Sequence, residues 1–192
     1  MNSPKYQDLS KFTVPADFRG KSKVYTQLWW FVQSSLFKLS PKFMYSFRCS
    51  LLRLFGAKIG KGVLIRPSAT ITYPWKLSIG DYTWIGDESI IYNLGYIEIG
   101  SNVSIAHRVY LCTGFHDINK ITFDIGEKPI KIEDEVWLPN DVFVGPGVTI
   151  GRGTVVGARS SVFGDLPEGM ICYGSPARPI KPRNSGTEKH KY

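Results

Sequence analysis

Aliphatic residues recur every six positions along most of the chain. Each repeat between residues 59 and 162 begins with Ile, Leu or Val, and Gly follows it in seven repeats. A helix repeats every 3.6 residues and a strand every two, so neither alone explains a period of six. This period is typical of a parallel β-helix, in which each short strand covers the one before it. The fifteen first positions are Ile59, Ile65, Ile71, Ile79, Ile85, Ile91, Ile99, Ile105, Leu111, Ile132, Leu138, Val144, Ile150, Val156 and Val162.

The spacing is interrupted three times, each time after a third repeat. Two extra residues follow the repeat of Ile71, two follow that of Ile91, and fifteen follow that of Leu111. Three repeats therefore form one triangular coil, and fifteen repeats predict an all-β prism of five coils, about 24 Å tall. All three insertions leave the same corner, and repeat proteins tend to place insertions on their working face. The inserted segments are residues 73–76, 93–96 and 116–131.

The chain divides into three segments. Residues 1–58 are basic and rich in aromatic side chains, residues 59–167 form the β-helix with its inserted loop at 116–131, and residues 168–192 form a C-terminal segment and tail. Within the first segment, residues 24–55 predict two short helices with a break near Pro41.

Two interpretations of these helices remain open. They could cap the first coil, whose open strand edges otherwise invite aggregation. Alternatively, an aromatic cluster could dock on an anionic membrane surface together with nearby cations, since different faces of a helix can do different jobs. The cations are Lys21, Lys23, Lys38, Lys42 and Arg48. The cluster consists of Trp29, Trp30, Phe31 and Phe37. The longest apolar run is too short to span a bilayer.

The net charge of +8 is concentrated at the two ends of the chain. Residues 1–58 carry +8 and residues 175–192 carry +4, whereas residues 59–174 carry −4. An acidic prism argues against a nucleic-acid partner. The three cysteines are odd in number and have no C-x-x-C spacing, which favours a reducing compartment. No signal peptide is evident, so we expect a cytoplasmic protein, with peripheral membrane contact through 24–55 as the open alternative.

Several segments outside the repeats resemble the hexapeptide-repeat O-acyltransferases. Within that family the chain looks like the colanic acid and related exopolysaccharide acetyltransferases. The matching segments are Q-D-L-S-K-F at 7–12, Q-L-W-W at 27–30, S-P-K-F-M-Y at 40–45, L-L-R-L-F-G-A-K-I-G at 51–60, L-C-T-G-F-H-D at 111–117, D-V-F-V-G-P-G-V-T-I-G at 141–151 and G-S-P-A-R-P-I at 174–180.

The resemblance implies a left-handed β-helix and transfer of an acetyl group from acetyl-CoA to a sugar hydroxyl of a free or lipid-linked glycan. His116, at the root of the long insertion, would be the general base, and an imidazole suits that role at neutral pH. Acetyl transfer would be direct, without a covalent acyl-enzyme and without a metal. Asn93, Asp117 and Trp137 would contact the acceptor. Asn93 could instead be a turn residue, and Asp117 could orient His116.

The same resemblance implies a binding site for CoA between two subunits. Arg178 and Lys181 are also reasonable contacts on physical grounds, because the phosphates of CoA carry negative charge and favour cations. Many relatives have Thr-Lys where Phe163 and Gly164 precede Asp165 here, so Arg159 would replace that lysine. The remaining wall of the site would come from a second subunit of a cyclic trimer. The expected CoA contacts are Asn140, Gly145, Ala158, Arg159, Phe163, Arg178 and Lys181.

Other functions of the same fold fit less well. A γ-class carbonic anhydrase needs three histidine ligands for zinc, and the prism has only His107 and His116. A noncatalytic prism would lack the long loop. The alternative that stays open is a nucleotide-sugar N-acetyltransferase or another small-molecule acyltransferase of the same fold. We also expect residues 1–23 to be dispensable for transfer to a soluble acceptor.

Overall fold

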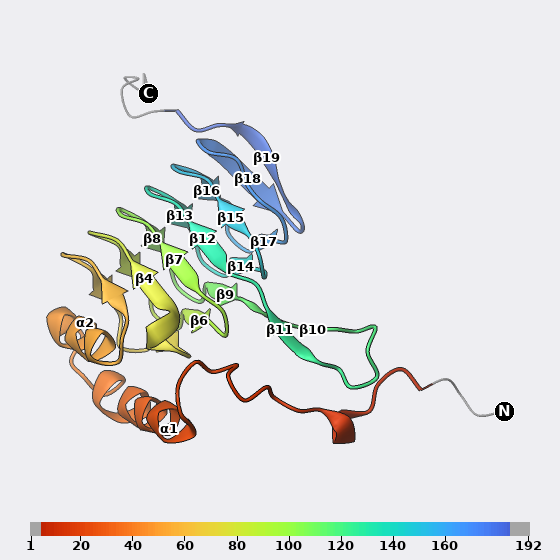
Figure 1. Cartoon of the computed structure of the whole chain (residues 1–192). Coiled ribbons are helices and arrows are strands. Elements are labelled where there is room, and N and C mark those ends of the chain that lie inside the picture. Colours follow the sequence, from red (N-terminus) through yellow and green to blue (C-terminus); the bar gives the residue numbers. More distant parts are fainter. Residues whose placement is uncertain (1–4, 185–192) are drawn as a thin grey trace.

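In the computed structural model, which describes residues 5–184, the repeats form a left-handed, three-sided prism of short parallel strands (Figure 1). Each side is one sheet, called here face A, face B and face C. Face A contains β1 (Lys58–Ile59), β4 (Leu77–Ile79), β7 (Ile97–Ile99), β12 (Ile130–Ile132) and β15 (Thr149–Ile150). Face B contains β2 (Leu64–Ile65), β5 (Trp84–Ile85), β8 (Ser104–Ile105), β13 (Trp137–Leu138), β16 (Val155–Val156), β18 (Met170–Gly174) and β19 (Ala177–Pro182). Face C contains β3 (Thr70–Ile71), β6 (Ile90–Tyr92), β9 (Tyr110–Cys112), β14 (Phe143–Val144) and β17 (Ser161–Val162).

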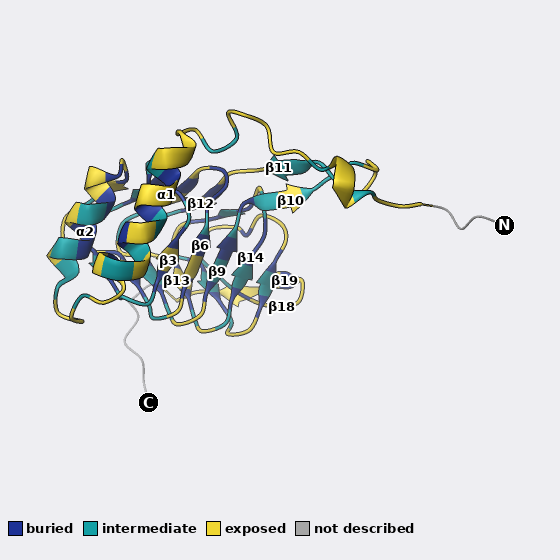
Figure 2. Ribbon diagram, turned by 90° about the horizontal axis from the view of Figure 1, so that it is seen from below, coloured by how far each residue is buried: buried dark blue, intermediate teal, exposed yellow. Residues whose placement is uncertain are grey.

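The aliphatic first positions of the repeats fill the interior of the prism. Fourteen of the fifteen are at most 3 % exposed, and Ile59 in the first coil is half-buried. Buried positions run through the strands, whereas exposed ones gather at the coil corners (Figure 2). Because the strands of successive coils pair in register, the same position of each repeat stacks on the next, and Ile79 pairs with Ile99 and Ile132 with Ile150. The predicted fold class is confirmed.

The prism is longer than the five predicted coils. Leu166 bridges Ile150 on face A, and Cys172, six residues later, pairs with Val156 on face B. An incomplete sixth coil is therefore present. The sequence pattern missed it because Leu166 follows Val162 after four positions instead of six, which breaks the period. The last strand, β19, runs antiparallel to β18.

All three insertions lie at the corner where face C passes to face A, as predicted. The first contains the 3-10 helix η3 (Pro74–Lys76). The third forms an antiparallel hairpin of β10 (Gly114–His116) and β11 (Ile125–Glu127), which projects from the prism (Figure 1). We call this corner, with its hairpin, the insertion corner.

The predicted helices of the N-terminal segment cover the first coil. They are α1 (Lys23–Val32), continued by the π-helical turn η2 (Gln33–Phe37), and α2 (Tyr45–Leu54). Their side chains hydrogen-bond to the open edge of each face: Arg53 donates to Ile59 O, Arg48 Nε to Ile65 O at 2.6 Å, and Trp29 Nε1 to Ile71 O at 2.9 Å. The capping interpretation is therefore confirmed.

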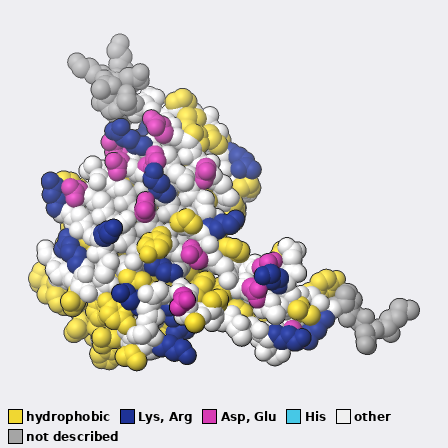
Figure 3. All heavy atoms as spheres, in the orientation of Figure 1, with side chains coloured by type: hydrophobic (Ala, Val, Ile, Leu, Met, Phe, Trp, Pro, Cys, Tyr) yellow, Lys and Arg dark blue, Asp and Glu magenta, His cyan; other side chains and the backbone are white. Residues whose placement is uncertain are grey.

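The membrane interpretation was wrong in three of its residues. Trp29, Phe37 and Arg48 are fully buried and cannot reach a membrane. Other hydrophobic side chains of the helical end are exposed and form a cluster on the surface (Figure 3). Within residues 5–184, no helix combines the length and hydropathy needed to cross a bilayer.

Residues 5–22 form a strap that runs from α1 to the insertion corner. It contains the 3-10 turn η1 (Leu9–Lys11). Just before η1, the Asp8 N–H donates to Ile121 O in the loop of the hairpin at 2.6 Å. Nearer to α1, Phe18 O accepts a hydrogen bond from Lys76 Nζ of the first insertion at 2.8 Å. The strap is therefore held to the loops of the insertion corner.

Candidate active site

His116 ends strand β10, opposite Ile125 of β11. Its Nδ1 lies 2.8 Å from the carbonyl oxygen of Phe123, and its ring stacks on the Phe123 ring with centroids 4.2 Å apart and an interplanar angle of 8°. Phe123 has a φ of +52°, in the left-handed region, which bulky residues adopt rarely. This turn carries the Phe123 carbonyl and ring back to the imidazole.

The contact with a carbonyl fixes the protonation of the neutral imidazole. A carbonyl oxygen can only accept, so Nδ1 carries the proton and donates it to Phe123 O. Nε2 then keeps a free lone pair. The residue as a whole is half-buried, between the rings of Phe123 and Phe12. The hairpin therefore presents His116 in the tautomer that a general base needs.

A second aromatic ring reaches His116 from the N-terminal strap. The ring of Phe12 lies 5.7 Å from that of His116 at an angle of 55°. Together with the backbone bond from Asp8 to Ile121, this contact ties the strap to the hairpin. That residues 1–23 are dispensable stays an untested prediction, and the packing of the strap on the candidate base argues against it.

Asp117 does not orient His116. Its Oδ1 accepts the N–H of Asn119 at 3.0 Å, and its carboxylate lies 4.0 Å from Lys120 Nζ. The orienting role that the sequence suggested for Asp117 belongs to the Phe123 carbonyl. Contact of Asp117 with an acceptor stays a prediction.

Asn93 is fully buried and cannot contact an acceptor in this structure. Its Oδ1 accepts the Tyr73 N–H at 2.9 Å, and its Nδ2 donates to the carbonyls of Tyr73 and Lys76. Thr113, one coil further on, bonds in the same way to Tyr92 O and the Gly95 N–H. These side chains satisfy backbone groups that the insertions remove from the strand ladder. The prediction that Asn93 binds acceptor was wrong, and the turn interpretation was closer.

Cys112 is the thiol nearest to His116 along the chain. Its Sγ donates to Gly114 O at 3.4 Å, and burial raises the pKa of the thiol. A thiol held in its protonated form is a poor nucleophile. The insertion corner therefore offers a base and no activated cysteine.

Five of the predicted cofactor residues lie on or beside face B, together with Trp137, which was predicted to contact the acceptor. Trp137 is 48 % exposed and pairs with Val155, which pairs with Ile171, which pairs with Lys181. Three strand steps put Lys181 about 14 Å from Trp137. Arg178, opposite Tyr173 on the same two strands, is exposed as well. Face B thus carries an indole at one end of a row and two cations at the other.

The corner between faces B and C continues this row. The Arg159 N–H donates to Asn140 O at 3.0 Å, so the two residues stack on successive coils, with Ala158 exposed beside them. The Arg159 side chain is 86 % exposed and its Nε lies 3.9 Å from Asp141. Such a guanidinium is free to turn toward a phosphate.

Gly145 and Phe163 lie elsewhere, on the coils above the hairpin. Each directly follows a strand of face C, β14 and β17, and so begins the insertion corner of its coil. Phe163 is 62 % exposed and packs on Phe143 with centroids 5.6 Å apart. These two residues share a corner with His116.

The predicted site therefore falls into two groups within one chain. The base group consists of His116, Asp117, Gly145 and Phe163 at the insertion corner. The cofactor group consists of Trp137, Asn140, Ala158, Arg159, Arg178 and Lys181 on face B and its corner with face C. In a three-sided prism, face B lies opposite the insertion corner, so one chain does not bring the two groups together.

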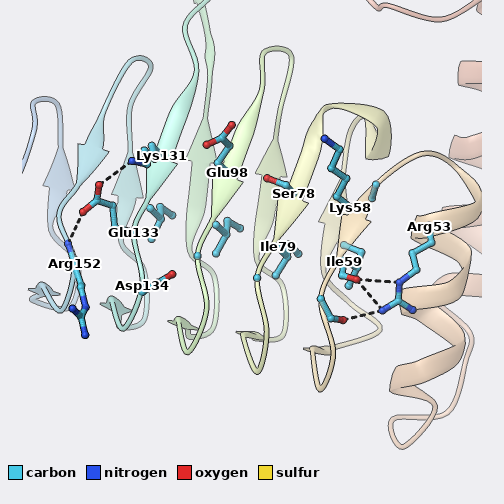
Figure 4. Close-up of a pocket in the computed structure, with 16 residues that line it drawn as sticks. Arg53, Lys58, Ile59, Ser78, Ile79, Glu98, Lys131, Glu133, Asp134 and Arg152 are labelled. Carbon is cyan, nitrogen blue, oxygen red and sulfur yellow. Dashed lines mark hydrogen bonds and ion pairs between the residues drawn. The ribbon is translucent and has the colours of Figure 1, made fainter.

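A groove of about 890 Å³ lies on face A and contains none of these residues. Figure 4 shows Lys131 paired there with Glu133 at 2.9 Å, while Glu133 also accepts the backbone N–H of Arg152 at 3.0 Å. Among residues 5–184, no cluster of three or more His, Cys, Asp or Glu residues is placed to hold a metal ion.

Sequence analysis missed Phe12 and Phe123, both of which touch His116. Neither belongs to the six-residue period, and the contribution of Phe123 comes from its backbone carbonyl, which no residue type announces. The only sequence feature near Phe12 was the segment Q-D-L-S-K-F, which was noted for resemblance alone.

Comparison with known proteins gives consistent relatives. The chain is 56 % identical to the colanic acid biosynthesis acetyltransferase WcaF of Escherichia coli K12, over 92 % of this chain and 97 % of that protein. It is 32 % identical to the galactoside O-acetyltransferase of the same organism, over 76 % and 72 % of the two chains. No family model matches the chain.

A solved structure shows the same fold with a ligand. The hexapeptide-repeat acetyltransferase VCA0836 of Vibrio cholerae, in complex with acetyl coenzyme A, superposes with a TM-score of 0.77 at 26 % identity, over 85 % of this chain and 89 % of that one.

Proposed function

Because the chain belongs to the hexapeptide-repeat acetyltransferases, together with the colanic acid biosynthesis acetyltransferase WcaF, we propose that it transfers acetyl from acetyl-CoA to a sugar hydroxyl during exopolysaccharide or other surface-glycan synthesis. The observation that carries this proposal is His116, whose Nδ1 is held by a carbonyl and whose Nε2 is free. The names of the relatives support the substrate classes: colanic acid, a galactoside and acetyl coenzyme A.

Proton transfer begins at Nε2 of His116. The sugar hydroxyl donates its proton to this lone pair while its oxygen attacks the thioester carbonyl carbon of acetyl-CoA. In the imidazolium that forms, the Nδ1 proton stays hydrogen-bonded to the Phe123 carbonyl. The positive charge therefore develops beside an acceptor that is already in place. The stacked Phe123 ring holds the imidazole plane during this step.

The second half of the reaction returns the proton. The C–O bond to the sugar forms first, the C–S bond then breaks, and the departing CoA thiolate takes the proton from Nε2 of His116. The base is regenerated without a covalent acyl-enzyme, in keeping with the protonated state of the Cys112 thiol. The sequence of steps is atom-balanced and needs no further reactant.

The cofactor group fits the shape and charge of acetyl-CoA. The row from Trp137 to Lys181 spans about 14 Å, a length suited to an extended pantetheine arm. Arg178 and Lys181 at its far end, with Arg159 beside it, offer cations to the CoA phosphates. The indole of Trp137 would wall the reacting end.

A second copy of the chain would complete the site. The base group and the cofactor group lie on opposite sides of one prism, and a heterologous contact repeated around a closed ring brings the insertion corner of one copy to face B of the next. We therefore propose a cyclic homotrimer with three shared sites. A cytoplasmic location would give the enzyme access to acetyl-CoA.

The variant His116→Ala tests the chemistry. We expect it to keep the wild-type unfolding curve and assembly while its acetyl-transfer rate falls at least about 100-fold, the usual contribution of a general base. His107→Ala is the matched control, since His107 is an exposed corner residue. Near-wild-type turnover by His116→Ala would remove His116 from the mechanism.

The acceptor is tested in a strain that lacks the chain. Mass spectrometry of its exopolysaccharide should show one sugar residue lighter by a single acetyl group. Unacetylated soluble nucleotide sugars, in place of that change, would favour the N-acetyltransferase alternative.

A further inference from the structure

The helical end of the molecule has two apolar faces. Trp29 and Val32 pack against the prism, whereas Val24, Leu28 and Phe31, spaced four and three residues apart, form an outward stripe on α1. Their exposed fractions are 79 %, 50 % and 67 %. More exposed hydrophobic side chains follow, namely Leu36, Leu39, Phe43 and Leu54. Figure 3 shows hydrophobic side chains gathered over this end. We call these seven residues the helix face.

The sequence that contains the helix face is basic, and in the fold Asp81 and Asp87 of the second coil pair with two of its cations, Lys61 and Arg66. From residue 18 to residue 80 the sequence has no Asp or Glu. The same stretch contains eleven cations: Arg19, Lys21, Lys23, Lys38, Lys42, Arg48, Arg53, Lys58, Lys61, Arg66 and Lys76. Lys21, Lys23, Lys38 and Lys42 are exposed, and within residues 5–184 none of them pairs with a carboxylate. This is an apolar face bordered by free positive charge.

We propose that the helix face docks the enzyme on an anionic lipid bilayer. Apolar side chains enter the acyl boundary, and the lysines beside them meet the headgroups, each adding attraction to a negatively charged surface. No described helix can span the bilayer, so the contact is peripheral. A second copy of the same face is a poorer occupant, because two basic surfaces repel each other.

Docking would place the candidate active site within reach of an acceptor at the membrane surface. The strap runs from Lys23, at the start of α1, to Phe12 on His116, so the helix face and the insertion corner are joined by a short stretch of chain. The proposal concerns the location of the enzyme and stands apart from the identity of the acceptor.

Flotation of the full-length protein with vesicles tests the proposal. One set of vesicles is pure phosphatidylcholine, and the other contains about one third phosphatidylglycerol, which supplies negative surface potential. The wild-type protein should float with the anionic vesicles, and binding should weaken as salt is added. The double variants Leu28→Asp/Phe31→Asp and Lys38→Glu/Lys42→Glu should each bind at least about tenfold more weakly.

Ile180→Asp is the matched control, since Ile180 is also about half exposed but lies on β19, at the other end of the prism. It should float like the wild type. All variants should keep their unfolding curves, and the two double variants should transfer acetyl to a soluble sugar at the wild-type rate, which separates this test from that of His116.

Three outcomes would overturn the proposal. The first is that the wild type binds both vesicle types equally or binds neither. The second is that Ile180→Asp loses as much binding as the double variants. The third is that Leu28→Asp/Phe31→Asp forms a smaller assembly in solution than the wild type, which would show that a second copy covers the face.

Discussion

At the scale of single residues, the position of one proton depends on the backbone conformation of Phe123. Its positive φ turns a carbonyl toward His116, so the tautomer is set by a main-chain group that tolerates many side chains. The stacked ring adds a second constraint on the imidazole. A histidine on a plain solvent loop would have neither.

Phe12 gives a prediction at this scale. Removing the ring with Phe12→Ala should free the strap from His116 and lower kcat by about tenfold, because small displacements of a base are costly. The KM for acetyl-CoA should not change, since the cofactor group lies elsewhere. Steady-state kinetics would measure both constants.

Two further variants complete that experiment. Phe12→Leu should recover most of the activity by refilling the space, and Tyr6→Ala, at an exposed aromatic of the same strap, should leave it unchanged. An effect of Phe12→Ala on KM alone would rule out a positioning role.

The sequence singled out His116 as a candidate base but gave no sign of its neighbours. The family resemblance, and its position at the end of a repeat where the longest insertion starts, both pointed to His116. Asn93 was misjudged because its residue type suits both a sugar and a backbone turn, and only burial distinguishes them. Phe12 lies over one hundred positions from His116, and no period links the two.

At the scale of elements, the helices act as a plug made of hydrogen-bond donors. Arg48 is fully buried and donates to four acceptors: Ile65 O, Ser40 Oγ, Pro41 O and Lys42 O. A strand edge normally needs another strand to satisfy its carbonyls, and here long polar side chains take that place. The contact between the helices and the prism therefore combines hydrogen bonds from polar side chains with packing of apolar ones.

Arg48→Met should lower the free energy of unfolding by about 2–4 kcal/mol, because it leaves buried carbonyls without donors. Chemical denaturation would measure this loss. Arg53→Met is the control: Arg53 also bonds to strand carbonyls but is exposed, so water can replace it and the loss should be about 1 kcal/mol or less. Equal losses in the two variants would contradict the importance of burial.

The repeats themselves were predictable, since fourteen of the fifteen first positions are buried and each insertion lies where the spacing breaks. The sixth coil was hidden by a shortened step before Leu166. The six-residue period reveals a coil only where every corner between two strands has the same number of residues.

At the scale of the whole molecule, the division of the site gives a test of assembly. Co-expression of His116→Ala chains with Trp137→Ala chains should restore about a quarter of wild-type activity, because random mixing in a cyclic trimer leaves that share of sites with both groups intact. Each variant alone should be inactive. Activity of the purified mixed assembly, compared with a mixture of the separately purified variants, would measure the recovery.

No recovery in mixed assemblies would mean that both groups act within one chain. That result would require a rearrangement that brings face B to the insertion corner, against the stiffness of a packed prism.

The direction and composition of the last strand, β19, affect whether further chains can add to the end of the prism. A stack of open strands is a template on which further chains can polymerise into fibres. Here β19 ends the stack in reversed direction, and Pro179 and Pro182 leave gaps in its row of N–H donors. With the opposite end plugged by Arg48 and Arg53, the chain offers a newcomer no continuous edge, and growth along the axis stops at a single copy.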